Sequence, residues 1–377
     1  VSRLYVFTAA RYYETMVTVD CDERMPYVLK KRNIARIERE RLLIGDRRAY
    51  PFERTFVACD SIADAVAAIK GMVTQGGGPL QVSLTAMEWL ACRMERGDIP
   101  CSVASFAVAF DQLKSSRPTN TTMARTLDGL LGDIRLLFAA HPDAAHRRGT
   151  ADAIRQAVHD RETSFNAVYE RMGRSGASLI ADGERILTTC FAEHSFLLSL
   201  LFARDEGRMA SVMVSETRPY FQGARLTAPS LKELGFDVTL ICDGMGARFI
   251  EDGTVGRYMT AADLVCADGT VVNKTGTLAN AVCARTFGIP YHAFSMAPDL
   301  SRRTRKDIVM EERDGADVCL AFGHPTTESD IFGRYPAFDI VPPAFVTSII
   351  TAEGVFEPEQ IGAHEFHRPG DRIVEET

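Results

Sequence analysis

The stretch "RILTTCFAEHSFLLSLLFARDEGRMASVMVS" (185–215) has the rhythm of a strand, a helix and a second strand. "RILTT" and "ASVMVS" suit buried strands, and an apolar helical run lies between them. Apolar strands that alternate with helices imply a parallel sheet covered on both faces. The C-terminal half is therefore predicted to be a Rossmann-like, doubly wound α/β domain. Four further strands are expected at 237–241, 262–266, 291–295 and 317–322.

Two helices of this half carry end signals. Thr227 is the expected N-cap of a helix that stops at Gly235. "TLANAVCARTFGIP" (277–290) is expected to end at Gly288, because glycine followed by proline is a common C-terminal signature.

The N-terminal half has apolar residues at helical spacing. Its connectors "QGGGPLQ" (75–81) and "KSSRPTNTT" (114–122) look on sequence alone like plain turns. "RSGAS" (174–178) is the expected domain junction, which gives domains at 1–175 and 176–356 and a tail at 357–377. Helices are predicted at 61–75, 84–97, 126–140 and 150–174.

The composition is that of an ordinary soluble globular protein. The 377 residues suffice for two domains, with 46% apolar and 25% charged residues. A net charge of -7 argues against a nucleic-acid partner. The nine cysteines form no CxxC pair, so no metal site or disulfide framework is expected. This usage predicts a location in the reducing cytoplasm. No apolar run is long enough to span a membrane, so no membrane partner is expected.

Polar residues follow the predicted strands, where ligands bind in such sheets. They are Cys190, Glu216 with Arg218, and Asp243. Asp263 begins an apolar run, where a carboxylate is expensive unless it is paired or functional. A salt bridge or a turn cap is the alternative for Asp263.

Two glycine-containing motifs and one cysteine leave choices open. "CDGMGARF" (242–249) lacks the third glycine of a dinucleotide fingerprint, so no NAD cofactor is expected. "GTVVNKTGT" (269–277) is no Walker motif, yet it places Lys274, Thr275 and Gly276 before a helix, as a possible anion site. Cys190 is either a catalytic thiol or a small buried residue, and a Cys190–His194 dyad is a third, weaker idea.

Three segments carry a family resemblance: "SETRPYFQGARLTAPSLKELG" (215–235), "ADLVCADGTVVNKTGT" (262–277) and "YPAFDIVPPAFVTSIITAEGV" (335–355). The chain resembles, over roughly residues 30 to 356, the family of methylthioribose-1-phosphate isomerases, ribose-1,5-bisphosphate isomerases and regulatory subunits of initiation factor 2B. "KKRNIARIERERLLIGDRRAYPFERTFVACDS" (30–61) is similar to the opening β-hairpins of that family. The resemblance implies a small antiparallel sheet beside the helices, and a homodimer.

The resemblance also implies site residues. The family's catalytic pair falls on Cys190 in "ILTTC" and Asp263 in "AAD". Its phosphate-wrapping turn falls on "QGGGP", which supplies backbone donors but has Gln75 where an arginine is expected. The implied contacts with substrate or phosphate are Gly76, Gly77, Arg117, Gln222, Asn273 and Lys274.

The implied reaction converts a ribose 1-phosphate to the ribulose 1-phosphate. Ring opening needs a general acid, assigned to Asp263 kept protonated by an apolar pocket, and Cys190 would manage hydrogen at C2. Gln75, Phe191, Glu193 and Leu264 depart from the family pattern. The substrate therefore stays open among 5-substituted and 5-deoxy ribose 1-phosphates and a ribose bisphosphate. A non-catalytic sugar-phosphate or nucleotide sensor, like the initiation-factor subunits, is the alternative function.

Overall fold

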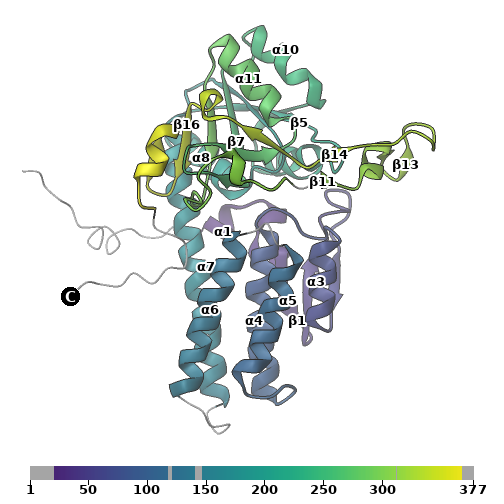
Figure 1. Cartoon of the computed structure of the whole chain (residues 1–377), viewed down its shortest axis with the longest axis vertical. Coiled ribbons are helices and arrows are strands. Elements are labelled where there is room, and N and C mark those ends of the chain that lie inside the picture. The colour runs from purple at the N-terminus through teal and green to yellow at the C-terminus, as the bar shows by residue number, and fades with distance from the viewer. Residues whose placement is uncertain (1–20, 118–120, 141–146, 311, 367–377) are drawn as a thin grey trace, which may run out of the picture.

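The computed structural model describes residues 21–117, 121–140, 147–310 and 312–366. A helical layer lies beneath an α/β layer, and the longest helix runs through both (Figure 1). The first twenty residues, part of "KSSRPTNTT" and the end of the tail lie outside the described residues.

A small antiparallel sheet opens the described chain, as predicted. Its strands are β1 (Ala35–Glu38), β2 (Arg41–Gly45) and β3 (Phe56–Cys59). Arg39 and Glu40 join the first two strands with φ of 49° and 65°, the left-handed geometry of a tight two-residue hairpin. Leu42 and Ile44 pack into a core shared with Trp89 of α4 (Gly78–Arg96). The sheet is therefore part of the helical layer.

Four of the five main helices match the sequence prediction in place but differ in their ends. α3 (Ile62–Lys70) begins with a capping box at Ser61 and stops at Gly71, short of residue 75. α4 begins at Gly78, so the "GGGP" turn leads directly into it. The fifth, α5 (Val103–Ser116), was not singled out from the sequence. The other two are α6 (Thr121–Ala140) and α7 (Arg147–Ala177).

α7 connects the two layers (Figure 1). It continues unbroken through the expected junction and ends at Ala177, so the domain division stays a prediction. Gly173 and Gly176 lie against α8 (Glu193–Asp205): a Cβ at Gly176 would meet Ser199 Oγ at 2.2 Å and Phe294 at 2.7 Å. These glycines let the two helices approach closely.

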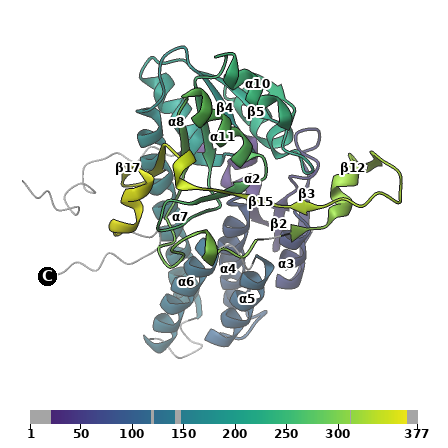
Figure 2. The ribbon, with the colours of Figure 1, turned by 45° about the horizontal axis from the view of Figure 1, so that its top comes forward.

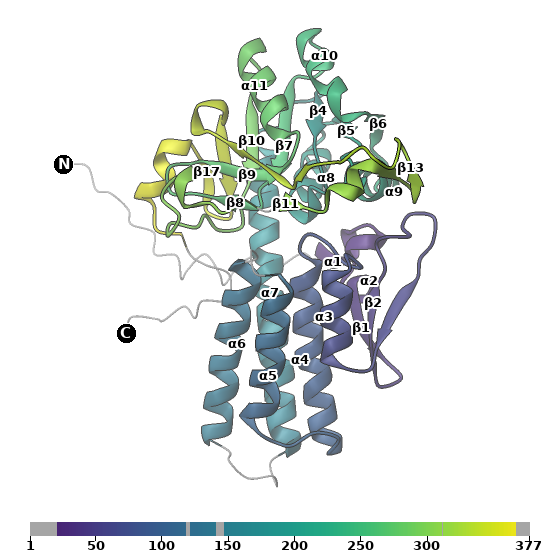
Figure 3. The ribbon, with the colours of Figure 1, turned by 45° about the vertical axis from the view of Figure 1, so that its right-hand side comes forward.

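The central sheet has seven strands in the order β17-β16-β10-β7-β4-β5-β6. All neighbouring pairs are parallel except β16–β17. Without the edge strand β17, this is the 3-2-1-4-5-6 order of a doubly wound sheet, with the order reversing between β4 and β7. The predicted fold class is confirmed (Figure 3). The strands are β4 (Arg185–Thr188), β5 (Ser211–Ser215), β6 (Asp237–Ile241), β7 (Arg257–Ala261), β10 (Tyr291–Phe294), β16 (Ser348–Thr351) and β17 (Gly354–Phe356).

Alternate residues of these strands face two separate cores, as the pleat requires. Ile186 and Val212 pack with α7 and α8 on one face. Leu187 and Met213 pack on the other face with α10 (Gly246–Glu251) and α11 (Thr277–Phe287). Both faces of the sheet are thus covered, which explains why the strands are apolar throughout.

Two predicted sheet strands are wrong. Residues 262–266 contain only β8 (Leu264–Val265), in a separate three-stranded sheet with β9 (Val271–Lys274) and β15 (Phe338–Val341). Residues 317–322 form a short 3₁₀ turn and β12 (Leu320–Ala321), in a hairpin arm with β13 (His324–Pro325) that projects from the body (Figure 2). The missed strands of the central sheet are β7, β16 and the edge strand β17. Short apolar runs do not reveal which partner they pair with.

Both predicted helix ends are found, although one of them lacks its expected capping bond. Gly288 follows α11 with φ 75° and ends it, as predicted. Thr227 occupies the N-cap position of α9 (Ala228–Glu233), as predicted, but its backbone is already helical and its side chain makes no capping bond. Its hydroxyl instead donates to the Cys190 carbonyl at 2.6 Å. The remaining short α-helices and strands of the described residues are α1 (Cys21–Arg24), α2 (Lys31–Ile34), β11 (Glu312–Arg313) and β14 (Tyr335–Pro336).

The close contact between α7 and α8 predicts a difference between two glycine substitutions. Gly176→Ala should lower the free energy of unfolding by about 1–3 kcal/mol, because its Cβ overlaps Ser199 and Phe294. Gly132→Ala in α6 meets nothing within 4 Å and should raise it by about 0.5–1 kcal/mol. Urea unfolding measures both values. Equal effects of the two substitutions would contradict this account of the helix contact.

Candidate functional site

A cavity of about 330 Å³ lies between the carboxyl ends of the parallel strands and the helical layer. Ligands of doubly wound sheets bind at this edge, close to the point where the strand order reverses. The structure brings all eight predicted site residues into the cavity wall: Gly76, Gly77, Arg117, Cys190, Gln222, Asp263, Asn273 and Lys274.

Cys190 lies just after β4, the central strand. Its φ is 68°, a left-handed conformation that costs free energy in any residue except glycine. Two hydroxyls hold the turn: Thr217 Oγ1 accepts from the Cys190 N–H at 3.0 Å, and Thr227 Oγ1 donates to its carbonyl. The thiol is therefore fixed at the cavity wall by residues of the segment after β5.

Burial raises the pKa of the Cys190 thiol to about 11, although the charge of Lys274 opposes the rise. The group is therefore a neutral thiol at neutral pH, which suits proton or hydrogen handling better than attack by a thiolate.

The Cys190–His194 dyad is not supported. His194 stacks on Tyr169 with ring centroids 4.6 Å apart, and its side chain is not part of the cavity wall. Burial lowers the pKa of His194 to about 4, so the ring is neutral. It is a packing residue between α7 and α8.

Asp263 follows β7, the strand next to β4. In the register that pairs Ile186 with Arg257, position 190 lies level with position 261. The two predicted catalytic residues thus flank the point of strand reversal. Asp263 is exposed, which corrects the expectation that an apolar pocket surrounds its carboxyl group.

Asn273 and Lys274 reach the cavity from β9, which pairs with β8 just beyond Asp263. Both side chains are buried. Lys274 Nζ donates to the Tyr335 hydroxyl at 3.2 Å and lies 4.7 Å from the centre of the Phe338 ring. Of the charged groups around Cys190, this ammonium group has the largest effect on the pKa of the thiol, which it lowers. A buried ammonium group at the cavity wall is a natural partner for an anionic ligand.

The anion site expected at the start of α11 is corrected by the structure. The backbone N–H groups of Gly276 and Leu278 donate to Asp339 Oδ2 at 2.8 and 2.9 Å. The side chain of Lys274, and not the amides that follow it, remains directed at the cavity.

Gln222 and Arg117 complete the polar part of the wall. Gln222 precedes a π-helical turn at Gly223–Thr227, and its buried side-chain oxygen has no hydrogen-bond partner among the residues that the structure describes. Arg117 Nη2 lies 3.1 Å from the Met72 sulfur. A ligand that donates a hydrogen bond would satisfy the Gln222 oxygen.

The glycine turn is arranged in a way that the sequence did not reveal. Both carboxylate oxygens of Glu193 accept from the Gly77 N–H, at 2.8 and 3.0 Å. Arg47, buried beside the turn, donates to the Gln75 carbonyl and lies 3.9 Å from Glu193. The positive charge missing at Gln75 is thus supplied from another segment, but the Gly77 N–H is occupied.

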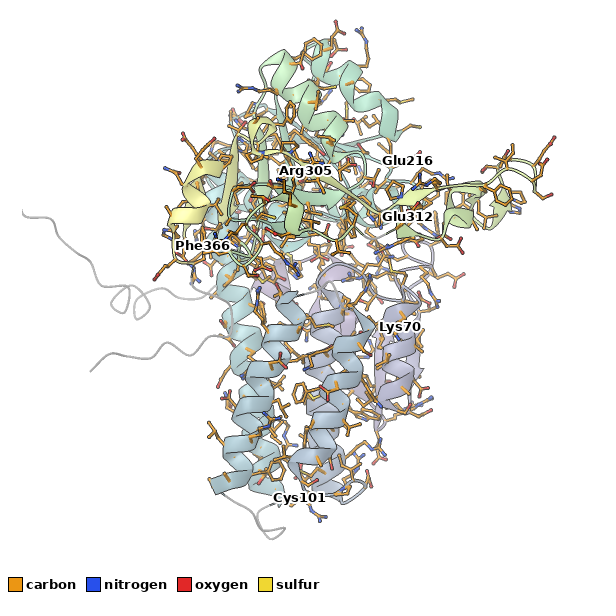
Figure 4. The ribbon with its side chains drawn as sticks, viewed as in Figure 1. Lys70, Cys101, Glu216, Arg305, Glu312 and Phe366 are labelled. Carbon is orange, nitrogen blue, oxygen red and sulfur yellow. The ribbon has the colours of Figure 1, made fainter. Side chains whose placement is uncertain are left out.

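Sequence reasoning missed several wall residues, among them Met72, Tyr169 and Arg313, because no local motif marks them. It also missed Arg47, which lies next to the turn but outside this wall. Conversely, Glu216, Arg218 and Asp243 follow strands yet lie outside this wall. The Asp243 carboxylate accepts from the backbone N–H groups of Thr217 and Arg218, so it fixes the loop that follows β5. Glu216, which begins this loop, is labelled in Figure 4.

The described part of the chain contains no group of three histidine, cysteine or acidic residues placed to hold a metal ion. None of the helices within the described ranges has the length and apolarity to cross a membrane. The expected cytoplasmic location stays a prediction.

This fold and this cavity define a class: two-layer proteins whose candidate site lies between a helical bundle and a Rossmann-like sheet. The model of the initiation factor 2 subunit family matches residues 85–358. The chain therefore belongs to that family, which confirms the resemblance in the sequence.

Relatives in this family are similar over most of the chain. The methylthioribose-1-phosphate isomerase of Pelotomaculum thermopropionicum is 32% identical, over 83% of this chain and 87% of the relative. That of an Anaeromyxobacter species is 34% identical, over 84% and 91%. Among solved structures, 5-methylthioribose 1-phosphate isomerase from Pyrococcus horikoshii has a TM-score of 0.72 at 27% identity, over 88% and 93%. The delta subunit of initiation factor eIF-2B from A. fulgidus has 0.72 at 26%, over 87% and 96%.

The raised pKa of Cys190 predicts how the thiol reacts with iodoacetamide. Only the thiolate reacts, so the rate should rise about tenfold per pH unit from pH 7 to pH 10. Peptide mass spectrometry measures it, with fully buried Cys266 as the residue that stays unlabelled in the folded protein. A rate of Cys190 labelling that levels off below pH 9 would show that the pKa of this thiol is not raised.

Proposed function

We propose that the protein is an aldose–ketose isomerase that converts a ribose 1-phosphate with a substituted or deoxygenated C5 to the corresponding ribulose 1-phosphate. The observation that carries this proposal is the meeting of Cys190 and Asp263 in one cavity, on either side of the strand reversal. The names of the relatives, methylthioribose-1-phosphate isomerases, support the same reaction class.

The reaction is balanced within the sugar. A phosphate on C1 locks the ring, so the bond between C1 and the ring oxygen must break. One hydrogen then moves from C2 to C1. The C2 hydroxyl loses its proton as C2 becomes a carbonyl, and the former ring oxygen gains one proton, so the number of protons does not change. No external oxidant or reductant is needed, so no cofactor is assigned.

Cys190 and Asp263 divide this work. Asp263 is the general acid at the ring oxygen, and the bound sugar itself would cover its exposed carboxyl group and exclude water. Cys190, a neutral thiol held by Thr217 and Thr227, faces the hydrogen at C2. The division follows the polarity of the site, because the acid lies at the open side and the thiol lies deeper.

The charged and amide groups of the wall hold the substrate. Lys274 and Arg117 bind the phosphate, which is the only strongly anionic group of the reactant. Gln222 and Asn273 hydrogen-bond the sugar hydroxyls. Such positioning accounts for much of the acceleration that an isomerase achieves.

The function is tested by incubation with ribose 1-phosphate, its 5-methylthio and 5-deoxy analogues, and ribose 1,5-bisphosphate, with the ketose read by NMR. Ketose from at least one of them is the expected result. Tight binding of one compound without turnover of any would contradict the proposal that the protein is an enzyme and would favour a sugar-phosphate sensor.

The roles of the catalytic pair are tested by substitution. Cys190→Ser and Asp263→Asn should each lower kcat at least about 100-fold, since each removes a proton-transferring group. Cys242→Ser changes an exposed cysteine outside the cavity and should leave kcat unchanged. Full turnover by Cys190→Ser would show that the thiol has no part in the reaction.

We also infer a homodimer, on the family resemblance alone. Light scattering of the purified protein should give twice the 41.5 kDa mass of the chain. A mass of one chain at micromolar concentration would contradict the inference.

A further inference from the structure

A second cavity, of about 380 Å³, lies at the base of the hairpin arm. Its wall combines residues of the helical layer, of the loop after β5 and of the arm. It shares only Met72 and Gln75 with the wall of the first cavity, and none of the eight predicted site residues lines it. A cavity of this volume is large enough for a small molecule. The isomerase reaction makes no use of it.

The wall of the second cavity carries more positive than negative charge. Its charged side chains are Arg47, Arg48, Lys70, Arg225 and Asp317. Arg48 donates to both carboxylate oxygens of Asp46, at 2.9 and 2.7 Å. Arg47 lies 3.9 Å from Glu193. The Asp317 carboxylate accepts from the Tyr220 hydroxyl at 2.7 Å. Two of the four cations therefore have an acidic partner outside the cavity.

Lys70 and Arg225 are the other two cations, and neither forms an ion pair with any residue that the structure describes. The Nε atom of Arg225 is buried and has no hydrogen-bond partner there either. The guanidinium group instead lies 5.7 Å from the centre of the Phe52 ring and 5.8 Å from that of Phe322. Buried N–H groups are normally satisfied, so the missing acceptor is an anion that enters the cavity.

The rim of the second cavity offers an aromatic surface beside these cations. Phe221 and Phe322 stack with their ring centroids 4.5 Å apart. Phe322 is nevertheless 66% exposed, and its φ of 53° is a strained conformation for a bulky residue. Covering this ring with an apolar group would be favourable. The cavity thus has a cationic part and an adjoining apolar part.

We propose that the second cavity binds a phosphomonoester that carries a flat apolar ring. Lys70 and Arg225 hold the phosphate, and the ring packs against Phe322. Two cations without counter-ions match a phosphomonoester better than a carboxylate, because the phosphate carries nearly two negative charges at neutral pH. This site is separate from the first cavity and does not depend on the isomerase reaction.

The test uses phenyl phosphate as the probe, with inorganic phosphate and benzoate as comparisons that lack the ring or the second charge. Calorimetry at one fixed ionic strength gives Kd for the wild type, Lys70→Gln, Arg225→Gln and Phe322→Ala. Lys70 is exposed, so its substitution keeps the test valid if Arg225→Gln does not fold. Lys232→Gln is the matched control, because Lys232 is exposed and lies outside both walls. Lys274→Gln reports any binding in the first cavity.

Phenyl phosphate should bind the wild type at least about tenfold more tightly than either comparison compound. Lys70→Gln and Arg225→Gln should each raise its Kd at least about fivefold, since each removes one charge-assisted contact. Phe322→Ala should abolish the preference over inorganic phosphate. Lys232→Gln and Lys274→Gln should leave the Kd of phenyl phosphate unchanged.

The inference is overturned if phenyl phosphate does not bind at millimolar concentration. It is equally overturned if only Lys274→Gln weakens binding, because the probe then occupies the first cavity. Weakening by Lys232→Gln as large as that by Lys70→Gln would show attraction to surface charge alone. Benzoate that binds as tightly as phenyl phosphate would contradict the choice of a phosphomonoester. None of these results depends on ketose formation, so this inference and the proposed isomerase fail separately.

Discussion

The reversal of strand order beside β4 is the constraint on which the site depends. Because β5 and β6 extend the sheet on one side and β7, β10 and β16 on the other, the chain leaves β4 and β7 in diverging directions. The gap between those two exits holds Cys190 and Asp263. The other wall residues come from both layers, including the glycine turn before α4, the helix α7 and the strand β9.

The turn after β4 shows how the fold supports a strained residue. Cys190 has a left-handed backbone although it is not a glycine. The hydroxyls of Thr217 and Thr227 hydrogen-bond its N–H and its carbonyl. Those threonines belong to the segment after β5, so the position of the thiol depends on pairing between β4 and β5. Stability of the sheet and placement of the reactive group are therefore one property.

Backbone donors that look like ligand sites in the sequence are satisfied within the protein. Asp339 takes the amides at the start of α11, and Glu193 takes the Gly77 N–H. Buried N–H groups need acceptors, and a carboxylate from a distant segment serves as well as a ligand does. Glycine and lysine motifs by themselves therefore overstate the number of open anion sites. The side chains of Lys274, Arg117 and Gln222 nevertheless line the cavity.

The sequence by itself determined the class of the fold, the family and a set of residues that line one cavity. Apolar strands that alternate with helices can be covered only as a doubly wound sheet, and "ILTTC", "FQGARLT" and "VNKTGT" mark cavity residues through family resemblance. It could not separate β7 and β16 from the apolar runs at 262–266 and 317–322, because strand pairing is a long-range choice that short patterns do not encode.

Only the tertiary structure decided that Asp263 is exposed, that Arg47 lies beside the glycine turn, and that Glu193 fills that turn. Burial and charge pairing arise from segments distant in sequence, and no local motif contains both partners.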